Sequence, residues 1–361
     1  ELEKIKRLYQ FVTTRIESSG PDWANNTAED TLLNGQGSRT ATLVALAQAS
    51  GLKADLLLAR RVGQNCGKGD DFCCYKEPLV RFWLNNGLVL DVDAESEDLT
   101  MGAISPSIAF TDALLVPLSA EDQKKARIVA LSTKAAMEKS IAEGDLTIND
   151  GNLSVNILVR LGPARAQEIR NLLRTAGGPE RQAFFEQLAI RIFPGATAVT
   201  GTALHEKDPE LPLELQLRYT VPQFITFTPK SGVVDIDQLA PALGLGSVYA
   251  RAATRKFPLY IESLYFESTI FHLHLPDGMN VITMPADFSS KGEFGEYSVR
   301  FIRLARQIDI HREFHIPVQV IMPERYAGFS NFARQIDEAE QQRISLGATG
   351  SASGDFRKSL R

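Results

Sequence analysis

Cysteine, histidine and tryptophan are scarce in this sequence of 361 residues, which has three, five and two of them. Long apolar runs are missing as well, because none reaches the ~18 residues that a membrane-spanning helix needs. The best candidate, residues 41–59, is interrupted by Gly51 and carries Lys53 and Asp55. The sequence therefore predicts no transmembrane segment.

Neither sign of charge dominates the sequence. The 39 Lys and Arg residues against 44 Asp and Glu residues give a net charge of −5, so nucleic-acid binding through a basic surface is not expected. The hydrophobic share of 44% and the charged share of 23% are typical of a folded protein and exclude wholesale disorder. At about 100–200 residues per domain, the length predicts two or three domains.

The two ends suggest that the chain is a piece of a longer protein. It begins at Glu1, in the first turn of a predicted helix and without a preceding methionine. Near the other end, residues 347–354 read GATGSASG, and we expect residues 347–361 to form a flexible tail.

The first ~100 residues have the pattern of helices followed by strands. Ile5, Leu8 and Val12 recur at helical spacing, and a second helix is predicted over 40–50. Strands are predicted over 52–61, 79–84 and 88–92, with a hairpin turn at 85–87 (Asn-Asn-Gly) between the last two. This order is typical of an α+β fold.

The rest of the chain is mostly of β character. A hairpin with its turn at 149–152 precedes two helices, strands fill 197–322, and a last helix is predicted over 326–343. We expect a domain over 1–135, a connecting β-hairpin and helix pair over 136–196, a C-terminal β-sandwich with short helices over 197–346, and the tail.

Residues 31–60 carry a family resemblance. The segment reads TLLNGQGSRTATLVALAQASGLKADLLLAR, and Gly35, Ala41, Thr42, Leu43 and Gly51 match the core motif of the transglutaminase-like superfamily. The segments 79–84 and 88–91 are similar to the later strands of that family. The resemblance implies a transglutaminase-like (papain-like) core in the first domain.

The resemblance also implies that the catalytic residues are lost. In the family, a cysteine at a helix N-terminus is activated by a histidine that a third residue orients. Those three positions fall here on Gly37, on Pro78 (or the adjacent Leu79) and on Asp91, and residues 52–92 contain no histidine. A shift of one residue would offer Ser38, a far poorer nucleophile without a base. We therefore expect a catalytically inactive relative.

Looser motifs resemble a bacterial architecture in which an uncharacterised N-terminal β-domain precedes a transglutaminase-like domain and a C-terminal β-domain. They are residues 102–118, 151–154 (GNLS), 193–195 (FPG) and 255–259 (RKFPL). Many members of that architecture are exported, which implies a periplasmic or cell-envelope location.

The three cysteines, Cys66, Cys73 and Cys74, lie close together in a predicted strand–loop–strand segment. Cys66 could form a disulfide with Cys73 or Cys74 in an oxidising compartment. The alternatives are reduced and inert thiols, a zinc site that lacks a nearby histidine, or Cys74 as a relocated nucleophile.

Two groups of histidine and acidic residues are candidate metal ligands. His272 and His274 share one face of a predicted strand, and so do His311, Glu313 and His315, but solvated positions on a sandwich are the preferred interpretation. The acidic residues from 91 to 98 lack the spacing of an EF-hand, so a solvated loop is favoured over calcium binding. We expect no metal and no cofactor.

The leading hypothesis is a non-catalytic interaction or scaffold module that binds a protein or peptide partner in the bacterial cell envelope. One alternative is a peptidase or amidase that uses Ser38 or Cys74. Another is a carbohydrate-binding β-sandwich, for which Tyr260, Tyr265 and Phe266 are the candidate aromatic residues.

Overall fold

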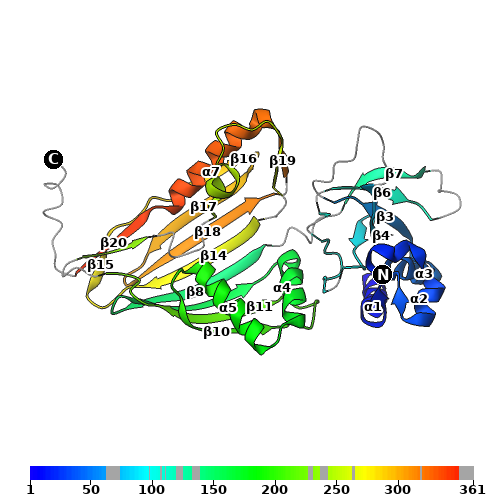
Figure 1. The fold of residues 1–361 in the computed structure, drawn as a ribbon, viewed down its shortest axis with the longest axis horizontal. Helices are drawn as coiled ribbons and strands as arrows, with labels where there is room; N and C mark the ends of the chain where they lie inside the picture. Colours follow the sequence, from blue (N-terminus) through cyan, green and yellow to red (C-terminus); the bar gives the residue numbers. More distant parts are fainter. Residues whose placement is uncertain are drawn as a thin grey trace. The chain divides into compact units, whose positions relative to one another are not determined.

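The chain folds into two compact units, which are described separately below (Figure 1). The computed structural model describes residues 1–61, 74–96, 98–105, 108–109, 111–118, 125–131, 139–226, 231–235, 243–261, 265–317 and 319–348. Unit 1 is formed by residues 1–138, 162–174 and 205–212, and unit 2 by residues 139–161, 175–204 and 213–361.

Unit 1 opens with three helices: α1 (Leu2–Arg15), α2 (Ala28–Asn34) and α3 (Arg39–Ala49). The side chain of Thr27 caps α2 by accepting a hydrogen bond from the Asp30 N–H, and Gly35 ends that helix with a φ of +70°. Two short parallel strands, β1 (Glu17–Ser18) and β2 (Gln36–Gly37), and the 3₁₀ helix η1 (Gly20–Asn25) connect the helices.

An antiparallel sheet of five strands follows, in the order β5-β4-β3-β6-β7. Its strands are β3 (Ala54–Ala59), β4 (Glu77–Trp83), β5 (Val89–Val92), β6 (Asp112–Val116) and β7 (Arg127–Ala130). The predicted hairpin turn at 85–87 joins β4 to β5. The sheet is packed on both faces, because Val80 and Phe82 of β4 contact α1 and α3 while Leu79 belongs to a second core with Ile104 and Ile108.

Two later stretches of the chain complete unit 1. They are helix α4 (Pro163–Thr175) and the segment 205–212. The guanidinium of Arg170 donates through Nη2 to the carbonyl oxygens of His205, Asp208 and Leu211, at 3.3, 3.0 and 2.6 Å. The Thr100 hydroxyl donates to the Pro209 carbonyl at 2.6 Å, so this segment is bonded to the N-terminal part of the unit.

Unit 2 is built on one eight-stranded sheet, in the order β10-β11-β9-β8-β14-β18-β17-β16. All neighbours are antiparallel except β8 and β14. The strands are β8 (Ser140–Asn149), β9 (Asn152–Arg160), β10 (Thr197–Leu204), β11 (Glu214–Val221), β14 (Tyr265–His274), β16 (Phe288–Gly292), β17 (Gly295–Arg303) and β18 (Gln307–Ile316).

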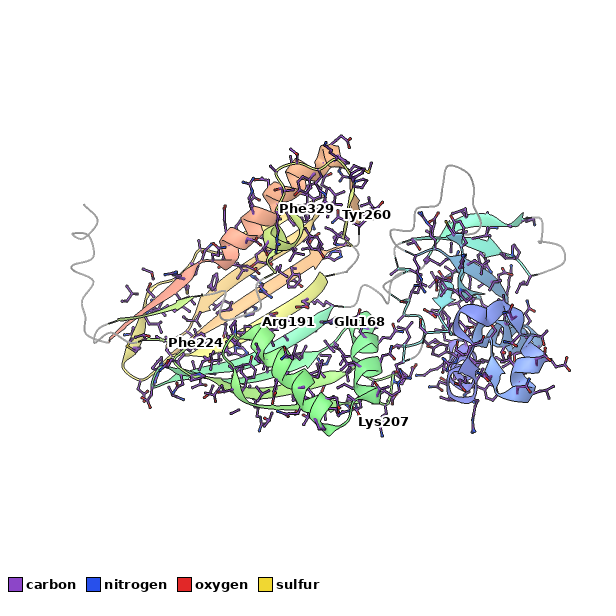
Figure 2. All side chains as sticks on the ribbon, viewed as in Figure 1. Glu168, Arg191, Lys207, Phe224, Tyr260 and Phe329 are labelled. Carbon is purple, nitrogen blue, oxygen red and sulfur yellow. The ribbon has the colours of Figure 1, made fainter. Side chains whose placement is uncertain are left out.

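Helices α5 (Gly178–Ile192) and α7 (Tyr326–Glu340) cover the apolar face of this sheet. Gly201 of β10 leaves room for the ring of Phe185 from α5, since a Cβ there would lie 2.1 Å from that ring. A buried ion pair of 3.0 Å joins Arg312 of β18 to Glu340 of α7. Phe329, labelled in Figure 2, is fully buried in the same helix.

The remaining elements of unit 2 are small. A three-stranded sheet has the order β12-β20-β15, and β13 pairs with β19. Their bounds, with those of helix α6 and the 3₁₀ helix η6, are β12 (Ser231–Asp235), α6 (Leu245–Tyr249), β13 (Leu259–Ile261), β15 (Met279–Thr283), β19 (Gln319–Ile321), η6 (Pro323–Arg325) and β20 (Arg343–Ala348).

The mixed helix and strand content agrees with the predicted α+β class, but the arrangement differs in three ways. Helices, and not a second large sheet, cover the eight-stranded sheet, so the predicted β-sandwich is corrected. The segment 136–196 supplies strands β8 and β9 to that sheet and helix α5 to the layer that covers it, instead of forming a connector. Gly347 and Ala348 belong to β20, inside the predicted tail, because β20 pairs with β12 and β15.

Candidate functional site

The N-terminus of α3 is where the family resemblance places a nucleophile. Ser38 is the N-cap of this helix, and its Oγ accepts a hydrogen bond of 3.0 Å from the Ala41 N–H. The first turn of α3 contains no acidic residue and begins with Arg39. No acidic side chain within the first turn of α3 therefore compensates the partial positive charge of the helix N-terminus.

Glu95 supplies that anion from the segment after β5. Its Oε1 accepts the backbone N–H of Thr40 at 2.9 Å and the hydroxyl of Ser38 at 3.3 Å. Its Oε2 accepts the hydroxyl of Ser18 at 2.5 Å. The carboxylate thus occupies the place where the helix would stabilise a thiolate or an oxyanion.

Gly37 lies in β2, directly before the cap, in a conformation that L side chains rarely adopt. Its φ is +148°, and a Cβ on it would lie 2.3 Å from Oγ1 of the buried Thr31. That oxygen also accepts the Ser38 N–H at 3.2 Å. A cysteine at position 37 would therefore displace a bonded side chain.

Asp91 faces away from α3, contrary to its assignment as the third catalytic position. It forms a bidentate ion pair with Arg81 across β4 and β5, at 2.7 and 2.8 Å, with both side chains buried. Arg81 alternates along β4 with Val80 and Phe82, which contact α1 and α3, so Arg81 and Asp91 lie on the other face. Pro78 is in β4 and offers no titratable group.

The predicted solvated loop after β5 is also corrected. Asp91 and Asp93 are buried, and Asp93 accepts two hydrogen bonds from Ser96, from its N–H at 3.0 Å and its hydroxyl at 2.7 Å. Burial raises the pKa of Asp93. The sequence analysis did not predict the role of Glu95. The one local indication is that α3 begins with Arg39 and has no acidic residue in its first turn, so an anion from elsewhere in the chain could be expected there. Glu97 lies outside the described residues.

The thiols do not offer a free nucleophile at Cys74, because Cys74 is disulfide-bonded. Cys66 and Cys73 lie outside the described residues, so the pairing stays a prediction. Ser38 is fully buried and both donates and accepts a hydrogen bond at the helix start.

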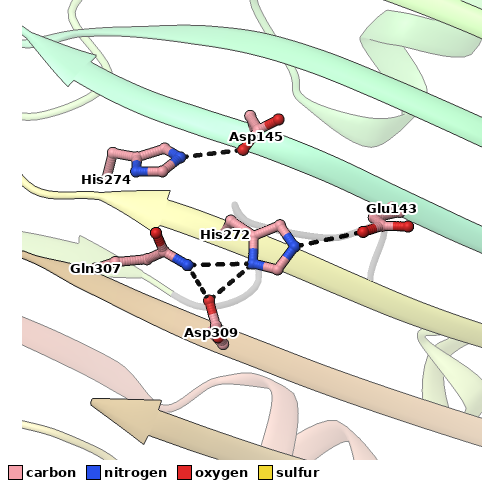
Figure 3. Close-up of polar contacts among 6 residues, drawn as sticks. All are labelled: Glu143, Asp145, His272, His274, Gln307 and Asp309. Carbon is pink, nitrogen blue, oxygen red and sulfur yellow. Dashed lines mark hydrogen bonds and ion pairs between the residues drawn. The ribbon is translucent and has the colours of Figure 1, made fainter. Parts of the chain in front are cut away.

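His272 and His274 lie in a polar cluster (Figure 3), on the face of the large sheet opposite to the buried Phe271 and Leu273. His272 Nδ1 lies 2.8 Å from Asp309 Oδ1, and His272 Nε2 lies 3.6 Å from Glu143 Oε1. His274 Nε2 lies 3.0 Å from Asp145 Oδ1. The hydrogen bond to Asp309 raises the pKa of His272, against the effect of partial burial.

This cluster has no metal-binding geometry. His311, Glu313 and His315 continue the same face along β18, with side chains that are exposed or partly exposed. No group of three or more His, Cys, Asp or Glu side chains in the described part of the chain is arranged to hold a metal ion.

Of the three aromatic residues predicted for carbohydrate binding, only Tyr260 has a described side chain. Tyr260 of β13, which is labelled in Figure 2, is 39% exposed. The side chains of Tyr265 and Phe266 lie outside the described part of the structure. No helix among the described residues is long and apolar enough to cross a membrane.

Comparisons with known proteins give a distant fold relationship. A family model described as a domain of unknown function with solved structure, DUF3858, matches residues 236–346. The crystal structure of a "putative protease" from Parabacteroides distasonis ATCC 8503 aligns with 96% of this chain at a TM-score of 0.50 and 10% sequence identity. This chain spans 52% of that one, about half its length. No curated protein matches the chain.

Proposed function

We propose that this chain is a non-catalytic interaction module of the bacterial cell envelope, built on a transglutaminase-like domain that has lost its nucleophile. The observation that carries the proposal is the Glu95 carboxylate at the N-terminus of α3. A thiolate or oxyanion at the same helix end would meet a like charge there. In this proposal the domain keeps helix α3 but cannot carry out nucleophilic catalysis at its N-terminus.

The alternative is a peptidase or amidase, which the structural likeness to a "putative protease" brings into consideration. At 10% identity that likeness concerns the fold alone. Ser38 has no histidine beside it among its hydrogen-bond partners in the described residues. A serine without a base is a weak nucleophile, so this function is the less favoured one.

The envelope location is supported by the disulfide of Cys74. Disulfides persist in oxidising compartments such as the periplasm and are rare in the cytosol. A protein or peptide partner is the corresponding proposal for what the module binds, since a transglutaminase-like cleft that has lost its chemistry could still hold a peptide-like segment.

The test is an activity assay on the purified chain with a fluorescent peptide, with and without a free amine. We expect neither cleavage nor amine incorporation, and no labelling of Ser38 by a fluorophosphonate probe. Turnover that disappears in Ser38→Ala but persists in Ser154→Ala, an exposed serine on the large sheet, would overturn the proposal. Rapid labelling of Cys74 by a thiol probe without reductant would overturn it as well.

A further inference from the structure

The opposite end of α3 borders an open pocket of about 410 Å³. Its apolar lining comes from Leu52, Leu115 and Pro117, and Gln48 contributes from the last turn of α3. This volume lies toward the small end of the range for ligand sites in proteins. An amino-acid derivative, a dipeptide or a single sugar ring would fill it.

One wall of the pocket is a fixed indole ring. Trp83 Nε1–H donates to Asp55 Oδ2 at 2.8 Å, and the Leu118 N–H donates to Asp55 Oδ1 at 3.0 Å. Asp55 is buried, so both of its oxygens are engaged inside the wall. The ring is held in place before any ligand arrives, which lowers the entropy cost of binding.

The charged residues that line the pocket are mainly basic. Among the described lining residues, Lys53, Lys125 and Arg127 contribute three cations, against one carboxylate, that of Asp55. The Lys53 ammonium lies 5.4 Å from the centroid of the Trp83 ring. In the described part of the chain, neither Lys53 nor Arg127 forms an ion pair with a carboxylate. The excess of positive charge favours an anion at the mouth of the pocket.

We propose that this pocket binds a small organic carboxylate. Lys53 and Arg127 hold the anionic group, and the body of the ligand rests against Trp83, Leu52 and Leu115. Two sources share this chemistry, the free C-terminus of a short peptide and an acidic sugar, and the experiment separates them.

The pocket is distinct from the site at the start of α3. Helix α3 has 11 residues, so its two ends lie about 16 Å apart. Carboxylate binding in this pocket can therefore be tested whether or not the domain is catalytically inactive, because a binding titration requires no turnover.

Tryptophan fluorescence provides a direct readout, because the chain has two tryptophans. Trp23→Phe leaves Trp83 as the single emitter. We would titrate this variant with N-acetyl-alanyl-alanine, with its C-terminal amide, with glucuronate and with glucose, at constant ionic strength. Calorimetric titration of the unmodified chain repeats each arm without the tryptophan substitution.

We expect one of the two acids to bind saturably and its neutral counterpart to bind at least about tenfold more weakly. The double variant Lys53→Gln/Arg127→Gln should lower the affinity by a similar factor. The matched control Arg191→Gln/Lys256→Gln removes the same charge from exposed positions in unit 2 and should leave the affinity unchanged.

Binding of the peptide acid alone assigns the pocket to peptide C-termini, and binding of glucuronate alone assigns it to acidic sugars. Equal binding of the acids and their neutral counterparts would overturn the proposal. So would an unchanged affinity in the Lys53→Gln/Arg127→Gln variant, or no saturation by either acid up to about 10 mM.

Discussion

Gly37 holds a backbone conformation that combines two constraints, a φ of +148° and a Cβ position already filled by Thr31. The first constraint strains any L-residue, and the second requires a buried, hydrogen-bonded side chain to move. The packing around β2 therefore opposes any side chain at position 37, including the cysteine that the family resemblance would place there.

Gly37→Ala should lower the free energy of unfolding of unit 1 by about 2–4 kcal/mol, since strain and overpacking act together. Urea denaturation followed by circular dichroism measures the change. Gly178→Ala is the matched control, because a Cβ there meets no atom within 4 Å. Equal stability of the two variants would contradict the steric argument.

The residues around Gly37 also show what a sequence can and cannot reveal about a site. The predicted helix over 40–50 located α3, which depends on local sequence, whereas the loss of a cysteine at position 37 stays an implication of the family resemblance. Neither the helix prediction nor the resemblance could place Glu95, which reaches Thr40 from 55 positions away in the chain. The family resemblance of segment 88–91 implies a catalytic position at Asp91, but the side-chain alternation along β4 and β5 directs Asp91 to the opposite face, toward Arg81.

At the scale of elements, local signals located the helices and hairpins well. The turns at 85–87 and 149–152 join β4 to β5 and β8 to β9, because such turns depend on a few adjacent residues. The long-range pairing could not be read in the same way. Strands β8 and β14 lie side by side in parallel although more than a hundred residues separate them, and no local pattern records that pairing.

The histidine cluster ties three of these strands together, because His272 on β14 lies between Glu143 on β8 and Asp309 on β18. The pKa of His272 is raised above 6.5, chiefly by its hydrogen bond to Asp309. Burial alone would raise the pKa of Asp309, but hydrogen bonds from Gln307 and His272 outweigh it and lower that pKa below 3.8.

The directions of these two pKa shifts define the pH range in which the interaction between His272 and Asp309 stabilises the fold. A raised histidine pKa contributes stability that is complete below about pH 6.5 and is lost as the pH rises through the folded-state pKa. A lowered aspartate pKa contributes above about pH 3.8 and is lost as the pH falls through its folded-state value. The interaction between His272 and Asp309 is therefore strongest between these two values.

His272→Asn should destabilise unit 2 by about 1 kcal/mol near pH 5.5 and by less near pH 8.5, because only the protonated ring attracts the carboxylates. Urea midpoints at the two pH values measure the difference. His205→Asn, which removes a histidine from unit 1, is the control. A pH-independent loss in His272→Asn would show that the ring contributes packing and not charge.

At the scale of the whole molecule, the chain passes between its two units five times. Unit 1 is assembled from three separate stretches, and Arg170 bonds the third to the second through three carbonyl oxygens. The predicted boundary near residue 135 captured only the first stretch, since contacts between distant segments leave no compositional break in the sequence.

Arg170→Met should lower the stability of unit 1 by about 2–4 kcal/mol, because three carbonyl groups lose their donor. Hydrogen exchange should accelerate in residues 205–212 before it does elsewhere in the unit. Arg165→Met on the same helix, whose side chain is 53% exposed, should change stability by less than about 0.5 kcal/mol. Unchanged exchange in 205–212 would contradict the role of Arg170.

The interleaved chain also has a consequence for biosynthesis. Domains generally fold as units while the chain emerges from the ribosome, and those nearest the N-terminus fold first. Unit 1 cannot be completed in that order, since its last stretch ends at residue 212, after three of the eight strands of the large sheet (β8, β9 and β10) have been synthesised. The first stretch of unit 1 must therefore stay partly assembled until residues 205–212 have been translated.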